Sequence, residues 1–235
     1  PKKRKTKQVI CVETGEIYPV YACSATKVDG CDMLLDAIVY SAPSPDKAKP
    51  ETAETDSGDA VEIECKADAP LAAICFKTIA DPFVGKMSFV KVLSGNLKND
   101  SNVINTTTGE PERMGKVLFV RGKKQLDAEY IKAGDIGAVT KLANAKTGDI
   151  LCDPQNEYKY PTFEFPTPTL EMCIKQKKKG EEAKISASLQ RIMEEDCTVG
   201  YRHDVETSQQ LIKGLGEQHL DVVLAKMKGK FGVEA

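Results

Sequence analysis

The sequence predicts a multidomain protein, mainly β plus α+β, with a strand-helix piece first, an antiparallel β-barrel next and a βαββαβ domain last. Short β-branched runs separated by turn residues predict the barrel, and alternating strand and helix patterns after residue 168 predict the last domain. Proline-rich and polar segments separate these regions. We therefore expect five parts: residues 1–43, a linker at 44–70, the barrel at 71–157, a linker at 158–168 and a last domain at 169–235.

The charge balance excludes a strongly basic nucleic-acid binder. The chain has 33 Lys and Arg against 35 Asp and Glu, for a net charge of -2. The basic excess lies in residues 71–155, which carry 12 bases and nine acids. No apolar run approaches the roughly 18 residues of a membrane span, and the start lacks the apolar core of a secretory signal. We expect a cytoplasmic protein with no membrane and no DNA partner.

The first part is expected to be the end of a larger domain. Residues 18–22 form a short apolar run typical of a strand, and residues 31–40 have the apolar spacing of a helix. A lone strand and helix cannot close a core. We expect the helix to bury its apolar face, including Met33 and Ile38, against the barrel or a neighbouring chain. Residues 41–59, polar and proline-containing, then read as a linker.

The barrel and the last domain follow from different periodicities. Gly-containing turns separate the barrel strands, and a closed barrel would leave no strand edge exposed. We expect barrel strands at residues 72–79, 87–93, 102–106, 115–120 and 136–142. We expect strand 169–175, helix 181–196, a hairpin of 197–202 with 209–214, and helix 216–230. This is the opening of a ferredoxin-like fold, whose final strand would only begin at residues 231–235, so we expect a chain cut at both ends.

Several stretches resemble one known family in order and spacing. Asp81-Pro-Phe-Val-Gly85 and Ala133-Gly-Asp-Ile-Gly-Ala-Val139 resemble parts of the second domain of elongation factor G, the ribosomal translocase. Gly214-Leu-Gly-Glu-Gln-His-Leu220 resembles the Gly-Met-Gly-Glu-Leu-His-Leu motif of its third domain. Further matches lie at residues 24–25, 34–37, 105–115 and 147–151. Because the matches run in sequence over most of the chain, it is identified as a member of this family of translational GTPases.

The resemblance implies a fragment with the remnant of a P-loop GTPase domain, the translation-factor barrel called domain II and most of domain III. The parent would use GTP and Mg²⁺ to drive translocation of tRNA and mRNA. The fragment would bind no cofactor and would dock on ribosomal RNA and ribosomal proteins, reaching tRNA and mRNA only through domains that it lacks.

The chain has few residues that could bind or hydrolyse a nucleotide. The resemblance assigns Ser24 and Ala25 to the last guanine-contact motif, which alone cannot hold GTP. The sequence has no G-x-x-x-x-G-K-[ST] loop to cradle phosphates and no Asn-Lys-x-Asp guanine reader. It also has no acid-base pair and no cysteine spacing typical of metal ligands. We therefore predict no catalytic residue and no metal site, so that this piece would not hydrolyse GTP.

Arg121, Lys123 and Lys124 are the candidate contacts to ribosomal RNA. They bracket Gly122 after a predicted strand, so a turn would present them to phosphates. A solvated hairpin tip is an equally good interpretation. Residues 175–179 are a second basic run, read as a polar loop before a helix, and residues 1–5 are read as a solvated end rather than a nuclear import signal.

Three departures from the usual family pattern leave the member open. Arg121-Gly-Lys-Lys-Gln125, Cys23 and Gln218 are closer to elongation factor G-like paralogues than to the main translocase. Ribosomal protection proteins that confer tetracycline resistance, a back-translocating factor and ribosome-recycling paralogues share the architecture. A stand-alone RNA-binding barrel is an alternative of another class. The distinguishing domains of the first group lie outside this chain.

The histidines and cysteines are given ordinary roles. His203 and His219 lack a partner motif and are expected to be structural or surface residues. Most of the eight cysteines stand in apolar stretches, where a reduced thiol packs as a small hydrophobe.

Overall fold

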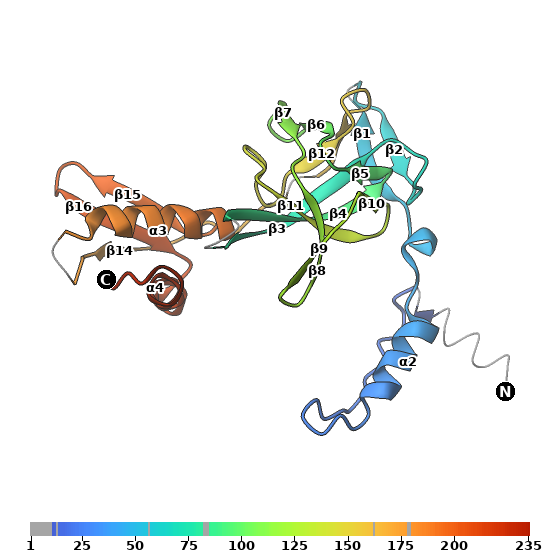
Figure 1. Ribbon diagram of the computed structural model, residues 1–235, viewed down its shortest axis with the longest axis horizontal. Coiled ribbons are helices and arrows are strands. Elements are labelled where there is room, and N and C mark those ends of the chain that lie inside the picture. Colours follow the sequence, from blue (N-terminus) through green and yellow to red (C-terminus); the bar gives the residue numbers. More distant parts are fainter. Residues whose placement is uncertain (1–10, 13, 56, 82–84, 162, 178–179) are drawn as a thin grey trace. The chain divides into compact units, whose positions relative to one another are not determined.

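The computed structural model describes residues 11–12, 14–55, 57–81, 85–161, 163–177 and 180–235 (Figure 1). The chain divides into two compact units, Pro1–Lys49 and Pro50–Ala235, which are described separately below. Residues 82–84 of the Asp81–Gly85 motif, Lys178, Lys179 and the basic residues 1–5 lie outside the described residues.

The first unit contains the predicted helix but lacks the predicted strand. Helix α2 (Cys31–Ser41) begins after Gly30, which adopts a left-handed conformation at φ 74°. Residues 18–22 form no strand, and Tyr18 and Val20 are exposed. A strand needs a neighbour for its backbone groups, and the described part of this unit supplies only a single bridge from Ser24 to Asp29. Helix α2 buries none of its residues, and the expectation that its apolar face packs on the barrel or a neighbouring chain stays a prediction.

The predicted linker at 44–70 contains regular structure. After a 3₁₀ turn at Pro45–Lys47, strands β1 (Glu51–Thr55) and β2 (Ala60–Ile63) form an antiparallel hairpin, and β1 also pairs with β13 (Tyr158–Lys159). Ala53 and Ile63 are buried by this pairing. The composition predicted a linker because most residues of these two strands are polar. Each strand has only one buried apolar position, which is too few to show the alternating pattern of a strand in the sequence.

The predicted barrel strands are present within an eight-stranded antiparallel sheet (Figure 1). Its order is β7-β6-β12-β3-β4-β11-β8-β9. The bounds are β3 (Ala72–Asp81), β4 (Gly85–Ser94), β6 (Asn102–Asn105), β7 (Glu110–Arg113), β8 (Val117–Arg121), β9 (Lys124–Asp127), β11 (Ile136–Thr140) and β12 (Ile150–Cys152). Sequence had predicted β3, β4, β6, β8 and β11 within a few residues.

The prediction of a closed barrel is wrong for the hydrogen-bonded ladder. The ladder ends at β7 and β9, which do not pair with each other. Strands β5 (Asn96–Lys98) and β10 (Tyr130–Lys132) instead pair with each other in a separate two-stranded sheet. Their central residues, Leu97 and Ile131, are fully buried in the same core as Val90 and Val117. One shared core therefore holds this domain together without a continuous ring of strands.

Gly95 shows why the turn after β4 requires glycine. Its φ of 72° is a left-handed conformation that residues with a side chain rarely adopt. An added Cβ would also lie 2.8 Å from backbone atoms of Ala69 and Leu71. The turn thus packs directly on the segment that leads into β3.

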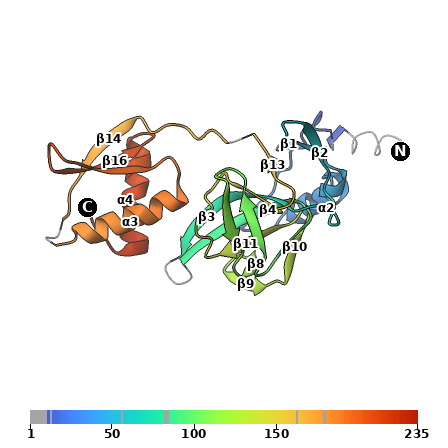
Figure 2. The same cartoon turned by 90° about the horizontal axis from the view of Figure 1, so that it is seen from above.

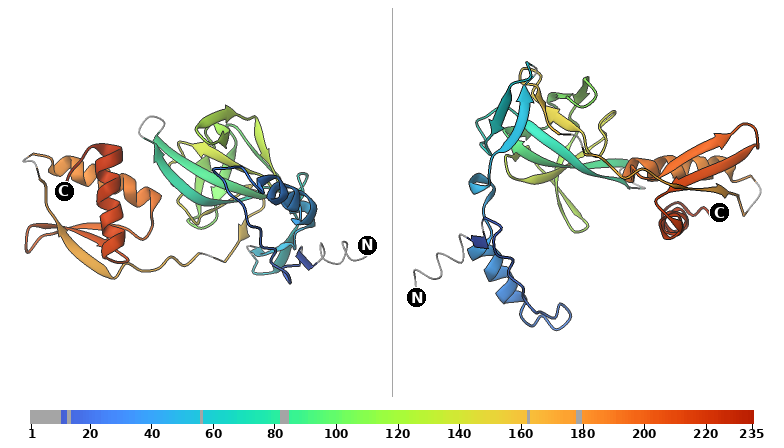
Figure 3. Two further views of the ribbon diagram at one scale, coloured as in Figure 1. Left: turned by 90° about the horizontal axis from the view of Figure 1, so that it is seen from below. Right: turned by 180° about the vertical axis from the view of Figure 1, so that it is seen from behind.

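The C-terminal domain has the predicted βαββα order. It contains β14 (Leu170–Ile174), α3 (Glu182–Glu195), β15 (Gly200–Asp204), β16 (Gln209–Gly214) and α4 (Glu217–Phe231), with sheet order β14-β16-β15. The two helices cross each other against one face of the sheet (Figures 2 and 3). Ile185, Leu189 and Ile192 of α3 and Val223 and Met227 of α4 are buried between them. The spacing of three and four that predicted these helices is the spacing of these core residues.

Candidate functional site

The basic hairpin, defined here as residues 121–124, is the clearest candidate contact surface. Arg121 ends β8 and Lys124 starts β9, and the two pair across the ladder. Gly122 has φ 59° and begins a two-residue turn, which is the position of glycine in the tight turns that suit a twisted hairpin. All four residues are exposed. The turn therefore presents three cations on one tip, as the sequence predicted.

The stem of this hairpin fixes the tip to the barrel core. Val117 is fully buried and Leu118 is 4% exposed, whereas the residues of β9 are all exposed. Lys116 Nζ lies 2.8 Å from Asp127 Oδ1 and joins the two strands at the base. Figure 1 shows the β8–β9 hairpin projecting from the body of the barrel. The charge on the tip is thus held away from the core rather than folded back onto it.

Ser24 and Ala25 lie in a turn of the first unit. The Ser24 amide donates to the carbonyl of Asp29 at 2.9 Å, and the Ser24 hydroxyl lies 3.4 Å from both Thr26 Oγ1 and the Lys27 amide. Ala25 is exposed. The turn is held by its own hydrogen bonds and is open on the side of Ala25.

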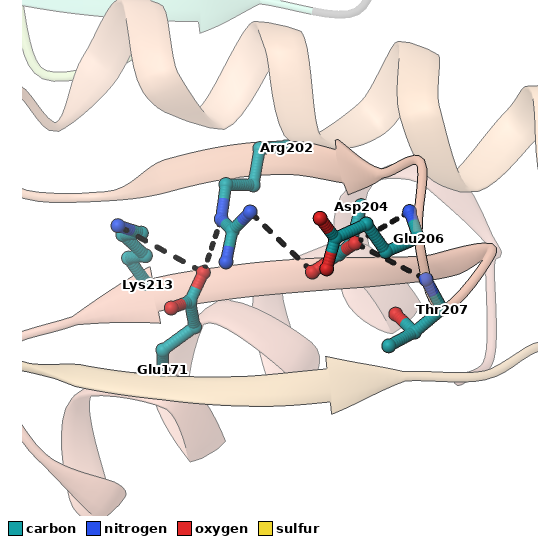
Figure 4. A network of polar contacts seen from close by, with 6 residues as sticks. All are labelled: Glu171, Arg202, Asp204, Glu206, Thr207 and Lys213. Atoms are coloured by element: carbon teal, nitrogen blue, oxygen red, sulfur yellow. Dashed lines mark hydrogen bonds and ion pairs between the residues drawn. The ribbon is translucent and has the colours of Figure 1, made fainter.

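A polar network covers the sheet face of the C-terminal domain that lies opposite the helices (Figure 4). Arg202 of β15 donates from Nε to Glu171 Oε1 of β14 at 2.6 Å. Lys213 Nζ of β16 is 3.8 Å from the same oxygen, and Arg202 Nη1 is 3.6 Å from Asp204 Oδ2. The hydrogen bond from Arg202 lowers the pKa of Glu171. Acids and bases alternate across this face, so it carries no excess of either charge.

Asp204 also shapes the turn between β15 and β16. Its Oδ1 accepts hydrogen bonds from the amides of Glu206 at 3.0 Å and Thr207 at 3.2 Å. These bonds, with that from Thr207 first, lower the pKa of Asp204. No sequence pattern predicts this network, because its residues come from three separate strands and are brought together only by strand pairing.

His219 has a structural role, as expected from the sequence. Its Nδ1 accepts from the amide of Leu215 at 3.0 Å, so the ring proton belongs on Nε2, which lies 3.1 Å from Asp196 Oδ2. Asp196 Oδ1 in turn accepts from the amide and the hydroxyl of Thr198, at 2.9 and 2.6 Å. The histidine of the Gly214–Leu220 motif thereby ties the start of α4 to the end of α3.

The cysteines are less buried than the sequence suggested. Only Cys75 and Cys152 are buried, and Cys23, Cys173 and Cys197 are exposed. Burial raises the pKa of the Cys75 thiol and raises that of Cys152 to about 11. Cys173 lies in an apolar stretch but alternates with buried Ile174, so it falls on the solvent side of β14.

The described residues offer neither a metal site nor a membrane-spanning helix. They hold no group of three or more His, Cys, Asp or Glu side chains placed to share a metal ion. None of the helices in the described ranges has the length and apolar character needed to cross a bilayer.

Comparison with known proteins gave two family matches and a structural match. Residues 70–154 match the model of elongation factor G domain 2, and residues 165–235 match that of elongation factor G domain III. Together they span well over half of the chain. A crystal structure of a protein from Thermus thermophilus is similar over 98% of this chain, with 25% identity and a TM-score of 0.74. The chain spans 32% of that protein.

Proposed function

Because the chain belongs to the elongation factor G family of translational GTPases, we propose that it is the ribosome-docking and coupling part of a translation factor. The whole protein would hydrolyse GTP in the cytoplasm and move tRNA and mRNA through the ribosome. The observation that carries this proposal is the succession of the two family domains, at residues 70–154 and 165–235, in one chain. A single small barrel would support many functions, whereas this pair is particular to one family.

The basic hairpin is the proposed contact to ribosomal RNA. Phosphates attract Lys and Arg without regard to base sequence, and counterion release makes the attraction depend on salt. Arg121, Lys123 and Lys124 are exposed together at the tip of a paired hairpin, with no acid among them. This geometry supports a docking role better than an isolated cation would, because three charges reach the same stretch of backbone.

GTP and Mg²⁺ belong, in this proposal, to parts of the whole protein other than the described residues. Ser24 and Ala25 would be the remnant of a guanine-contact motif. These residues do not fit GTP alone, because the Ser24 amide already donates to Asp29 and the sequence has no P-loop. No step of GTP hydrolysis is assigned to this chain.

A paralogue of the main translocase is the second candidate. The run Arg121-Gly-Lys-Lys-Gln125, Cys23 and Gln218 favours it, since each departs from the pattern expected of the translocase. A ribosome-recycling factor or a ribosomal protection protein would use the same docking surface. These members therefore share the test below.

The docking proposal is tested by sedimenting the chain with purified bacterial ribosomes across a salt series. A triple variant, Arg121→Gln with Lys123→Gln and Lys124→Gln, removes three charges from the tip. If all three contact phosphates, the slope of log K against log salt becomes shallower by about 2–3. The matched control changes three other exposed bases of the barrel, Lys77, Lys91 and Lys98, to Gln.

Two results would count against docking through the hairpin. One is equal loss of binding in both triple variants, which would indicate a general charge effect. The other is an unchanged slope in the hairpin variant. Failure of the unmodified chain to bind ribosomes at low salt would instead remove the ribosome proposal itself, leaving a barrel with another partner.

A further inference from the structure

The end of helix α3 breaks a simple electrostatic rule. The backbone dipole of a helix favours bases near its C-terminus and disfavours acids there. Helix α3 ends in Glu194 and Glu195, is followed by Asp196, and has no base in its last turn. Such a local conflict is expected to persist only where other contacts compensate for it. Asp196 has its contacts with Thr198 and His219 within the C-terminal domain.

Glu195 has contacts in both domains that compensate for its position. Its side chain is only 7% exposed, and its Oε1 accepts a hydrogen bond from the backbone amide of Ala80 at 2.8 Å. Ala80 lies near the end of β3 in the barrel and is itself 4% exposed. The same oxygen accepts from Lys230 Nζ of α4 at 2.5 Å. One carboxylate therefore joins β3 of the barrel to both helices of the C-terminal domain.

Strand pairing explains why the Ala80 amide is available. On one side β3 pairs with β4 along its whole length. On the other side it pairs with β12 only from Ala72 to Ile74. The Cys75 amide still donates to the carbonyl of Asp149, but beyond it this edge of β3 has no ladder partner among the described residues, so a buried amide there needs another acceptor. The carboxylate of Glu195 supplies a charged acceptor, which makes a stronger hydrogen bond than a neutral carbonyl.

A second contact between the two domains is weaker. Cys197 Sγ lies 3.9 Å from the carbonyl oxygen of Thr147, which is a weak contact. Relative motion of two domains in one chain is expected unless their interface is large and hydrophobic. The hydrogen bond from Ala80 to Glu195 contributes to holding the barrel on the C-terminal domain, and it is made or lost at a single side chain.

We propose that Glu195 is a releasable latch between the barrel and the C-terminal domain. The latch is closed when Oε1 holds the Ala80 amide, and Lys230 keeps the carboxylate in position by neutralising it. When the bond to Ala80 breaks, the two domains turn about the connecting residues 163–169. This inference concerns the chain itself and does not depend on ribosome docking.

The test measures both the bond and the domain orientation by NMR on the 235-residue chain. Hydrogen exchange of the Ala80 amide reports the bond, and residual dipolar couplings report whether the two domains align as one body. We expect one common alignment in the unmodified chain. In Glu195→Ala we expect exchange at Ala80 to be faster by about tenfold or more, because a hydrogen bond to a charged acceptor is lost. We also expect the two domains to align independently.

Two further variants make the result specific. Glu194→Ala removes the neighbouring acid, which is exposed, and is expected to leave exchange and alignment within about twofold of the unmodified chain. Lys230→Met keeps the acceptor but removes its counter-charge, so we expect an intermediate increase in Ala80 exchange. If Glu195→Ala disturbs the core resonances of the C-terminal domain, Lys230→Met decides the question.

Three outcomes would overturn the latch. Independent alignment of the domains in the unmodified chain would show that nothing holds them. An unchanged exchange rate of the Ala80 amide in Glu195→Ala would show that the hydrogen bond to Glu195 does not protect this amide. Faster exchange with a retained common alignment would make Glu195 a cap for one strand amide and no more.

Discussion

Glu112 anchors an entire loop of the barrel domain through one buried carboxylate. It lies on β7 and is only 4% exposed. Its Oε1 accepts the amide of Ala143 at 2.7 Å, and its Oε2 accepts the amides of Asn144 at 2.8 Å and Ala145 at 3.0 Å. Replacing Glu112 with Ala removes all three acceptors at once. We predict that this change destabilises the barrel domain far more than an average substitution.

The magnitude follows from the burial of the three amides. Ala143 and Asn144 are exposed, so their amides regain hydrogen bonds to water, and each lost bond costs roughly 0.5–1 kcal/mol. Ala145 is fully buried, and its orphaned amide costs roughly 1–3 kcal/mol. The expected total for Glu112→Ala is about 3 kcal/mol. Glu112→Gln keeps one acceptor oxygen without the charge and is expected to cost about 1 kcal/mol.

Urea unfolding followed by two-dimensional NMR measures this loss domain by domain. A single bulk probe is unsuitable because the chain has more than one domain. With an m-value of about 1–1.5 kcal/mol/M, Glu112→Ala lowers the barrel midpoint by about 2–3 M urea. The matched control is Glu110→Ala, an exposed acid on the same strand, expected within about 0.5 kcal/mol of the unmodified chain. A cost below about 1 kcal/mol for Glu112→Ala would refute the reasoning.

Two further changes probe close packing and acid sensitivity. Gly115→Ala would place a Cβ 2.3 Å from the carbonyl oxygen of Thr140, so strands β8 and β11 must shift, and the barrel midpoint should fall by the equivalent of about 2–3 kcal/mol. Asp196→Asn should destabilise the C-terminal domain at neutral pH. Burial raises the pKa of Asp196, but the hydrogen bonds from Thr198 and His219 outweigh it and hold the pKa below 3.8. This stabilisation is present above the unfolded pKa and is lost as the pH falls through the lower folded pKa, so the two proteins converge in acid.

Each of these two predictions has its own check. Gly109→Ala is the control for the glycine, because Gly109 has φ 75° but no neighbour within 4 Å of an added Cβ. It should cost only about 1 kcal/mol from backbone strain, and a Gly115→Ala loss no larger than this would contradict the clash. For Asp196, urea midpoints are measured at several pH values. A difference that stays constant down to about pH 2 would show that ionisation of Asp196 is not its source.

Sequence patterns predicted the helices and the long strands well, for a physical reason. Helices α3 and α4 each bury one stripe of apolar side chains, and that stripe is visible in the spacing of Ile185, Leu189 and Ile192. Strands β3 and β4 are ten residues long and rich in β-branched or aromatic residues. The βαββα order of the C-terminal domain followed directly from these elements.

Short polar strands escaped prediction because their pairing is decided in three dimensions. Strands β9 and β1 have few or no buried positions, and β5 and β10 have one each. A run of three or four residues with one apolar side chain does not differ from a loop in sequence. The reverse error occurred at residues 18–22, where apolar residues suggested a strand that has no partner in the described part of its unit.

The candidate site was partly predictable. Three bases around Gly122 predict an exposed hairpin tip, because the charged residues and the turn residue are neighbours in the sequence. The contacts of Glu195 with Ala80 and Lys230 link residues far apart along the chain, and no periodicity encodes them. The only sign in the local sequence was the acids at the C-terminal end of helix α3. They oppose the helix dipole and form no recognised motif.

The open ladder of the barrel domain has a consequence for association with other molecules through strand edges. In a sheet that ends in β7 and β9, these two edge strands have unpaired backbone groups with which a strand of another molecule could pair. Both edge strands are short and carry charged side chains: β7 has Glu110 and Arg113, and β9 has Lys124 and Asp127. Strand β7 also contains Pro111, which has no amide hydrogen to donate to an added strand. Short, charged strands therefore oppose the addition of a further strand at both ends of this ladder.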